Sequence, residues 1–127
     1  MSTAFFASML LAASLPATSG TPAQRQIAAA RSAIAREPQA ARPLVDLAVG
    51  LARRARETSD PAFYARAEEA LGQAEVKAPG DYQARRARVW IKLGQHRFAE
   101  ARDEARALNR SAPDDLLVYG LLADAHL

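Results

Sequence analysis

The sequence predicts an all-α fold of antiparallel helix hairpins, and three observations support this. Apolar residues make up 50% of the chain and aromatic residues only 6%, while alanine alone supplies about a quarter, which favours closely packed helices. Helical periodicity runs from about Gln24 onward, without any convincing run of alternating β-type residues. Pro38, Pro79 and Pro113 each follow a helical stretch that a proline would end.

The residues before this region predict a separate leader. Residues 1–24 carry no charged side chain, and an apolar run at 4–13 is followed by small residues up to Gly20. This pattern is typical of a secretory signal peptide, although the usual basic start is missing. The run is shorter than the roughly 20 apolar residues of a stable membrane span. We therefore expect residues 1–23 to be a signal peptide, cleaved between Ala17 and Ala23, or a disordered leader. Export to a bacterial periplasm follows from the first alternative, and a cytoplasmic location from the second.

A repeat with a period of about 34 residues runs through the helical region. Pro79 and Pro113 are one period apart, and the same spacing joins further similar pairs: Tyr64 with Phe98, Ala67 with Ala101, and Ala74 with Leu108. A second pattern, bulky, bulky, small, bulky at offsets of 0, 3, 4 and 7, follows two of the prolines. It is formed by Leu44, Leu47, Ala48 and Leu51 after Pro38, and by Tyr119, Leu122, Ala123 and His126 after Pro113. These offsets place four side chains on one helical face.

In its period and in this pattern, the chain from about residue 23 onward resembles the tetratricopeptide repeat family. The resemblance implies a short right-handed α-solenoid in residues 24–127, made of a half repeat (24–38), two repeats (39–79 and 80–113) and a further half repeat (114–127). Two departures are visible. The middle first helix offers Ala84, Ala87 and Trp90 in a shifted register, and the first repeat is seven residues longer around Asp60, which can cap a helix. A plain helical bundle is the alternative.

Six helices are expected in this region, at about 22–37, 41–56, 61–78, 82–93, 97–109 and 114–127. Ile27, Ala30 and Ile34 should face inward from the first of them. Gly72 and Gly120 are interpreted as positions where two helices approach closely.

By the resemblance, the first helices of the repeats line a concave groove that binds a peptide or a helical segment. The residues expected to face this groove are Arg42, Val45, Val49, Arg53, Arg88 and Lys92. Their arginines favour a protein or peptide partner that carries acidic residues. The alternative interpretation of these arginines is a solvated surface, on which the long side chains cover alanine.

The last helix is apolar almost all round, whereas a terminal repeat normally has a polar outer face. Leu117, Leu121 and Leu127 are therefore expected to form an exposed association face. Self-association or poor solubility follows from this expectation. The alternative is that the sequence is an incomplete piece of a longer regulatory or assembly protein, without an independent activity.

Catalytic, metal and cofactor sites are not expected. The chain has no cysteine, and its two histidines, His96 and His126, have no nearby ligands at helical spacing. Adjacent carboxylates such as those of Glu68 and Glu69 point about 100° apart on a helix, so they do not form an acid–base pair. The net charge is +3, but acids alternate with bases throughout, which does not indicate nucleic-acid binding. The sequence therefore predicts a non-catalytic scaffold that binds other proteins.

Overall fold

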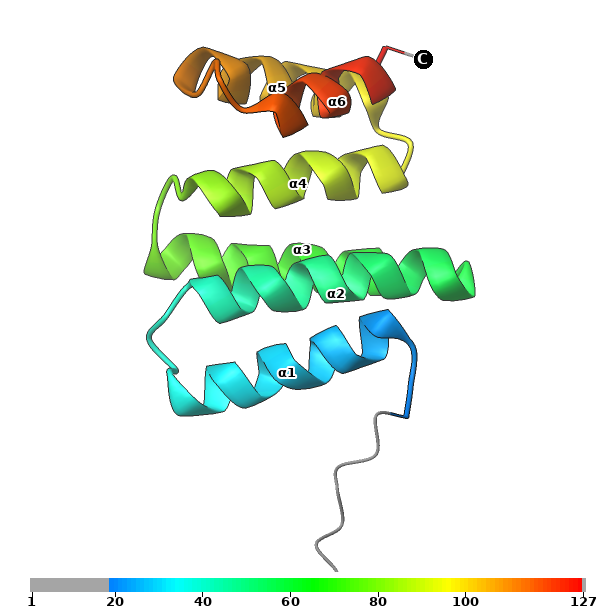
Figure 1. Cartoon of the computed structure of the whole chain (residues 1–127), viewed down its shortest axis with the longest axis vertical. Helices are drawn as coiled ribbons and strands as arrows, with labels where there is room; N and C mark the ends of the chain where they lie inside the picture. The colour runs from blue at the N-terminus through cyan, green and yellow to red at the C-terminus, as the bar shows by residue number, and fades with distance from the viewer. Residues whose placement is uncertain (1–18, 127) are drawn as a thin grey trace, which may run out of the picture.

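The computed structural model describes residues 19–126, and these residues are all-helical (Figure 1). They form α1 (Pro22–Arg36), α2 (Arg42–Thr58), α3 (Ala62–Lys77), α4 (Tyr82–Gly94), α5 (Phe98–Ser111) and α6 (Leu116–Asp124). The prediction of an all-α fold is confirmed, and the helix ends lie within three residues of those expected. Most of the predicted leader, and Leu127, lie outside the described residues.

The folded region begins earlier than the boundary expected at residue 24. The Thr21 hydroxyl accepts a hydrogen bond from the Gln24 amide at 3.3 Å, and the Gln24 side chain accepts one from the Thr21 amide at 2.8 Å. This reciprocal cap starts α1 at Pro22. Glu57, near the end of α2, accepts hydrogen bonds from the Thr21 hydroxyl and from the Ala23 amide, and Ala23 is completely buried. Residues 21–23 therefore pack as part of the helical region, which starts about three residues before residue 24.

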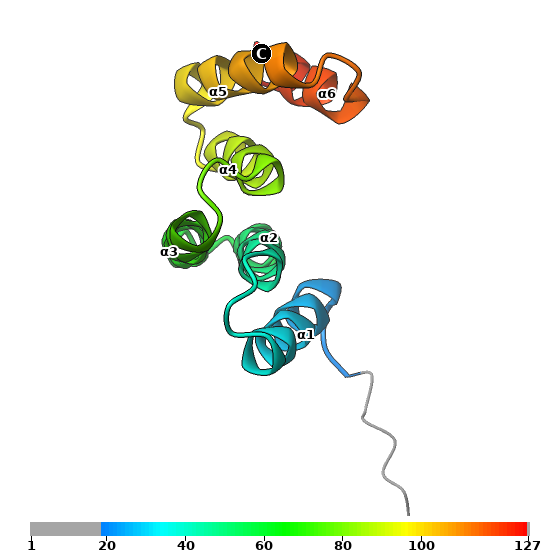
Figure 2. The same cartoon turned by 90° about the vertical axis from the view of Figure 1, so that its left-hand side faces the viewer.

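Consecutive helices run in opposite directions and stack along the long axis of the molecule (Figure 1). Figure 2 shows α3 toward one side of the stack and α2 and α6 toward the other, with α4 between them and beneath α5. Beyond the contacts between consecutive helices, α4 also packs against both α2 and α6. Helices α2, α4 and α6 thus form one continuous layer, and α3 and α5 form a second layer behind it.

The buried side chains form two separate clusters. One lies among α1 to α4 and includes Leu71, and the other lies among α4 to α6 and includes Leu108. Helix α4 contributes to both, because Ala84, Ala87 and Ile91 belong to the first cluster while Val89 and Leu93 belong to the second. Trp90, expected on the inward face, is only partly buried, and the fully buried Ile91 takes that place.

The inward face of α6 also differs from the expectation. Tyr119, Ala123 and His126 are exposed, whereas Val118 and Ala125 are buried. Counted from the preceding proline, α6 buries the same positions as α4: Val118 and Ala125 lie five and twelve residues after Pro113, as Ala84 and Ile91 lie after Pro79. The expected positions, six, ten and thirteen residues after Pro113, fall on the exposed side of α6.

The glycines that allow close approach are not the two expected. Nothing lies within 4 Å of a Cβ built on Gly72 or on Gly120. A Cβ on Gly50 would instead lie 3.0 Å from the Ile27 side chain of α1, and one on Gly94 would overlap the Tyr64 ring. The tight contacts are therefore those between α1 and α2 and between α3 and the end of α4.

Candidate functional site: a groove lined by α2, α4 and α6

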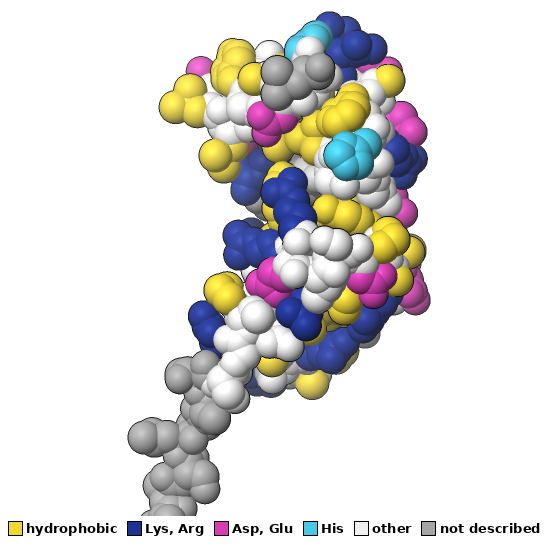
Figure 3. Space-filling view, turned by 90° about the vertical axis from the view of Figure 1, so that its right-hand side faces the viewer, with side chains coloured by type: hydrophobic (Ala, Val, Ile, Leu, Met, Phe, Trp, Pro, Cys, Tyr) yellow, Lys and Arg dark blue, Asp and Glu magenta, His cyan; other side chains and the backbone are white. Residues whose placement is uncertain are grey.

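A hollow of about 530 Å³ lies on the side of the molecule formed by α2, α4 and α6. Figure 3 shows it in the profile of the molecule, with basic and hydrophobic side chains beside it. We call it the concave groove. Its lining residues come from four helices: Gln26, Arg42, Val45, Asp46, Val49, Arg53, Gln83, Arg86, Ala87, Trp90, Leu117 and Leu121.

Each long helix contributes one stripe of side chains to this groove. On α2 the stripe runs from Arg42 through Val45 and Val49 to Arg53, and on α4 it runs from Gln83 to Trp90. The intervals of three, four and seven residues keep each stripe on one face of its helix. Because α4 packs against both α2 and α6, it forms the floor of the groove, and the other two helices form its walls.

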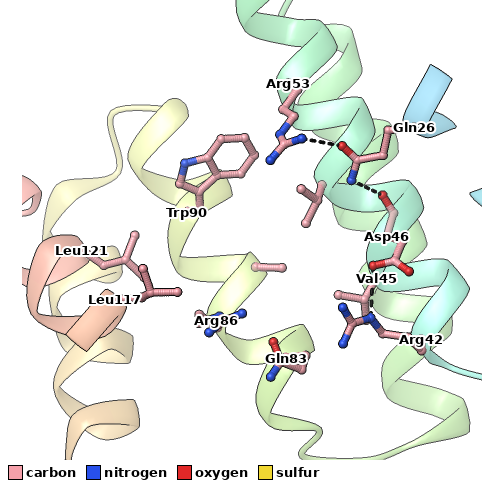
Figure 4. Close-up of a pocket in the computed structure, with 12 residues that line it drawn as sticks. Gln26, Arg42, Val45, Asp46, Arg53, Gln83, Arg86, Trp90, Leu117 and Leu121 are labelled. Carbon is pink, nitrogen blue, oxygen red and sulfur yellow. Dashed lines mark hydrogen bonds and ion pairs between the residues drawn. The ribbon is translucent and has the colours of Figure 1, made fainter. Parts of the chain in front are cut away.

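The α2 wall carries a chain of polar contacts. The Arg42 guanidinium meets the Asp46 carboxylate at 3.1 Å, and both side chains are largely exposed. Gln26 of α1 donates to the Asp46 carbonyl oxygen at 3.2 Å and accepts from Arg53 at 2.8 Å (Figure 4). Within residues 19–126 Arg53 pairs with no carboxylate, so its positive charge meets only a neutral amide.

The α6 wall is fixed to α4 through Asp115. One carboxylate oxygen of Asp115 accepts from the Leu117 amide at 3.0 Å and so caps α6. The other accepts from the Tyr82 hydroxyl at 2.6 Å and lies 3.4 Å from the Arg86 guanidinium. The hydrogen bond from Tyr82 lowers the pKa of Asp115, and the same bond raises the pKa of Tyr82. We call the contacts of Asp115 with Tyr82 and Arg86 the Asp115 clasp. This clasp orients the first turn of α6, which carries Leu117.

Apolar side chains occupy the middle of the groove, between the polar contacts. Val45 and Val49 come from α2, Trp90 comes from the floor, and Leu117 and Leu121 come from α6 (Figure 4). The Arg56 guanidinium lies 4.5 Å from the centre of the Trp90 ring, in cation–π geometry. The groove therefore presents an apolar centre with arginines around it.

Four of the six predicted groove residues line the groove, all of them on α2: Arg42, Val45, Val49 and Arg53. The placement of Arg88 and Lys92 is corrected. Arg88 pairs with Glu75 of α3 at 3.8 Å, and Lys92 lies 3.1 Å from Glu104 of α5 with its side chain only 13% exposed. Arg88 and Lys92 lie two positions past Arg86 and Trp90, which places them on the side of α4 that faces the second layer.

The residues that take their place on α4 are Gln83, Arg86 and Trp90. They lie four, seven and eleven residues after Pro79, the same offsets as those of Arg42, Val45 and Val49 after Pro38, so this spacing is the signal that could have identified them. Asp115 was also missed, although the sequence holds a signal for it. It lies one repeat period after Asp81, and Asp81 caps α4 by accepting from the Ala84 amide at 2.8 Å.

Two of the three residues predicted for an association face belong to the groove. Leu117 is 63% exposed and lines the groove with Leu121. Leu127 lies outside the described residues. The apolar residues of α6 that are exposed outside the groove are Leu116, at 80%, and Tyr119, at 48%. Helix α6 thus has two apolar faces, of which only one faces the groove.

No group of three or more histidine or carboxylate side chains within residues 19–126 could hold a metal ion. His96 lies in the turn before α5, and its ring meets the edge of Phe98, while His126 is exposed after α6. In the same part of the chain, every helix is too short or too polar to cross a membrane.

Comparison with known proteins gives no relative on which to base an assignment: no family model matches the chain, and neither does any curated protein or solved structure. The groove and the repeat must therefore be interpreted from their own geometry.

Proposed function

We propose that this protein is a non-catalytic scaffold of the tetratricopeptide type, which binds a segment of another protein in the concave groove. The observation that carries the proposal is the composition of that groove: equivalent faces of successive helices line it with apolar residues surrounded by arginines.

The repeat itself is supported by side chains one period apart that occupy equivalent places. Ala67 and Ala101 are both fully buried, as are Ala74 and Leu108. The inward face of α4, with Ala84, Ala87 and Ile91, recurs one period later in α6 as Val118, Leu121 and Ala125. Asp81 and Asp115 cap their helices at the same spacing. These correspondences favour a repeat array over a plain bundle.

One expected correspondence is not met. Tyr64 is buried against Gly94, whereas Phe98, its counterpart in the next repeat, is 40% exposed. Tyr64 is covered because α4 extends past it to Gly94, and no described residue takes the place of Gly94 against Phe98. The difference lies in the neighbour that covers the ring, while the helices that carry the two residues share three buried positions one period apart: Ala67 with Ala101, Leu71 with Ala105, and Ala74 with Leu108.

The groove suits binding because its lining is held by regular helices before any partner arrives. The α2 stripe is fixed by Gln26 and the α6 wall by the Asp115 clasp, so little conformational freedom remains to be lost on association. Apolar side chains at the centre can supply affinity, and the surrounding charges can supply orientation and selectivity.

A selection from an unbiased library of displayed peptides on the full-length chain tests the proposal. Selected peptides should bind the unmodified protein and lose binding to Leu117→Asp, which places a charge in the groove. Leu116→Asp is the matched control, because Leu116 is the adjacent exposed leucine and does not line the groove. The proposal fails if no peptide is enriched, or if the selected peptides lose binding equally to both variants or to neither.

We also propose that the protein is exported, as the leader suggests. If a leader is removed, the cut must precede Thr21, because Thr21 caps α1 and Ala23 is buried in the core. The intact mass of the protein recovered from the producing cell tests this, and an uncleaved chain or a mature form that begins after Thr21 would contradict it.

A further inference from the structure

We infer that the concave groove takes an amphipathic α-helix with an acidic residue near each end of its bound face. This inference rests on the proposed function and names the class of partner. It is carried by the length of the groove, by its helical walls and by the positions of its two α2 arginines.

The groove is a trough that runs along the helices. On its α2 wall, Arg42 and Arg53 lie eleven positions apart in the sequence, which corresponds to about 16 Å along the helix at about 1.5 Å per residue. Helices α2 and α6 do not pack on each other in the described residues, and α4 lies between them as the floor. A fourth helix along this trough would contact α2, α4 and α6 together, and helices pack on one another through such side-chain ridges.

Only one face of that helix would enter. A hollow of about 530 Å³ holds a few apolar side chains but not a whole helix. Val45 and Val49 lie between the two arginines along α2. Trp90 comes from the α4 floor, and Leu117 and Leu121 lie on the opposite side of the groove (Figure 4). Apolar side chains at intervals of three, four and seven residues would meet these groups, and the rest of the helix surface would stay in water.

The charges of the groove determine which charged residues the occupant should carry. Three arginines and one aspartate line it, which leaves two positive charges in excess. Among the described residues, Arg53 has only the amide of Gln26 as partner, and the pair of Arg42 with Asp46 is exposed and easily redirected. An acidic residue at each end of the occupant would therefore meet one arginine at each end of the α2 wall.

The number of residues between the two acidic residues distinguishes a helical occupant from an extended one. A separation of eleven residues is just over three helical turns, so Arg42 and Arg53 lie on one face of α2, and a parallel or antiparallel helix needs its acids about eleven residues apart. An extended segment covers the same distance in about five residues.

Three synthetic peptides test the inference on the full-length chain. The first is alanine-based and fourteen residues long, with glutamate at its second and thirteenth positions and leucine at its fifth, sixth and ninth. A staple on its outer face keeps it helical, because short helices are marginal in water. The second carries lysine in place of both glutamates. The third keeps the glutamates and leucines but has a central proline and no staple, so it cannot form the helix.

Trp90, the single tryptophan of the chain, lies in the groove, so its emission reports occupancy when the peptides contain no aromatic residue. The stapled acidic peptide should shift this emission and saturate. The basic and the proline-containing peptides should each bind about tenfold more weakly. Arg53→Gln should weaken the acidic peptide about twofold to fivefold, which is the usual range for an exposed ion pair. Arg106→Gln, an exposed arginine of α5 away from the groove, should leave it unchanged.

The inference is overturned if the proline-containing or the basic peptide binds as tightly as the stapled acidic one. It is also overturned if none of the three shifts the emission of Trp90 while peptides selected from the library do, and in both cases the binding function of the groove survives. If neither designed nor selected peptides reach the groove, the proposed function fails together with the inference.

Discussion

The ring of Tyr64 occupies the space that a side chain at position 94 would need. A Cβ built on Gly94 would lie 2.6 Å from Tyr64 Cζ, in contact with the hydroxyl as well. Gly94→Ala should therefore destabilise the fold by about 1–3 kcal/mol through overpacking. Gly72→Ala, in an exposed part of α3 with open space around it, should stabilise the fold by about 0.5–1 kcal/mol. Urea unfolding followed by circular dichroism measures both, and equal stabilities for the two variants would contradict the close contact.

Glu57 makes the stability of the fold sensitive to acid. The Thr21 hydroxyl, followed by Arg54 and the Ala23 amide, lowers the pKa of this carboxyl from its ordinary value of 4.5. A lowered folded-state pKa means that the contribution of Glu57 is fully present above that ordinary value and is lost as the pH falls through the folded-state pKa. Glu57→Gln should therefore lower the thermal midpoint by a few degrees at pH 7 and have a shrinking effect below about pH 4. A difference that stays constant from pH 7 to pH 3 would exclude this role.

The clasp between Tyr82 and Asp115 should be visible at alkaline pH. Because the Asp115 carboxylate accepts a hydrogen bond from the phenol hydroxyl, the pKa of Tyr82 is raised above its ordinary value of 10.0. The stability that this raised pKa represents is present below pH 10 and is lost as the pH rises through the folded-state pKa. In Asp115→Asn the pKa of Tyr82 should return toward 10.0, as measured by NMR titration of its ring carbons.

The same residue should also hold α6 in place, because Asp115 caps that helix. Amide hydrogen exchange in α6 should become about fivefold faster in Asp115→Ala, which removes the cap as well as the clasp. Asp114→Asn is the control, because Asp114 is adjacent and exposed, and has no side-chain partner in the described residues. Equal exchange rates in the two variants would show that the clasp does not hold α6.

Self-association through α6 should depend on the face that does not line the groove. Leu116 and Tyr119 are exposed there, and apolar patches of this kind promote association. We expect the unmodified chain to sediment faster with increasing concentration, and Leu116→Asp to remove most of this dependence. If Leu117→Asp removes it and Leu116→Asp does not, the copies meet through the groove. A monomer at all concentrations would contradict the prediction.

The helices and their order could be predicted because their signals are local. Pro38, Pro79 and Pro113 mark the ends of α1, α3 and α5, and the cap by Asp60, which accepts from the Ala62 amide at 2.9 Å, could be predicted from one short stretch of sequence. The groove residues of α2 could be predicted for the same reason, because they follow from helical spacing after one proline.

The α4 side of the groove differs from the prediction, although its residues follow Pro79 at the same spacing as those of α2 follow Pro38. The predicted Arg88 and Lys92 lie two positions past Arg86 and Trp90, and each residue rotates a helix face by about 100°. The clasp was out of reach for another reason. The sequence around Asp115 predicts a helix cap, but the hydrogen bond of Asp115 with Tyr82 joins residues 33 positions apart. Only the packing of α6 on α4 brings these two residues together.

Because α4 is the one helix shared by the two buried clusters, the molecule has a natural line of separation. Arrays whose repeats contact only their neighbours can melt from one end, and the end formed by α5 and α6 rests on the smaller cluster. A chain opened there would keep the α2 wall with Arg42 and Arg53 but would lose the leucines that face them. It would still attract acidic segments by charge, while no longer distinguishing one segment from another by shape.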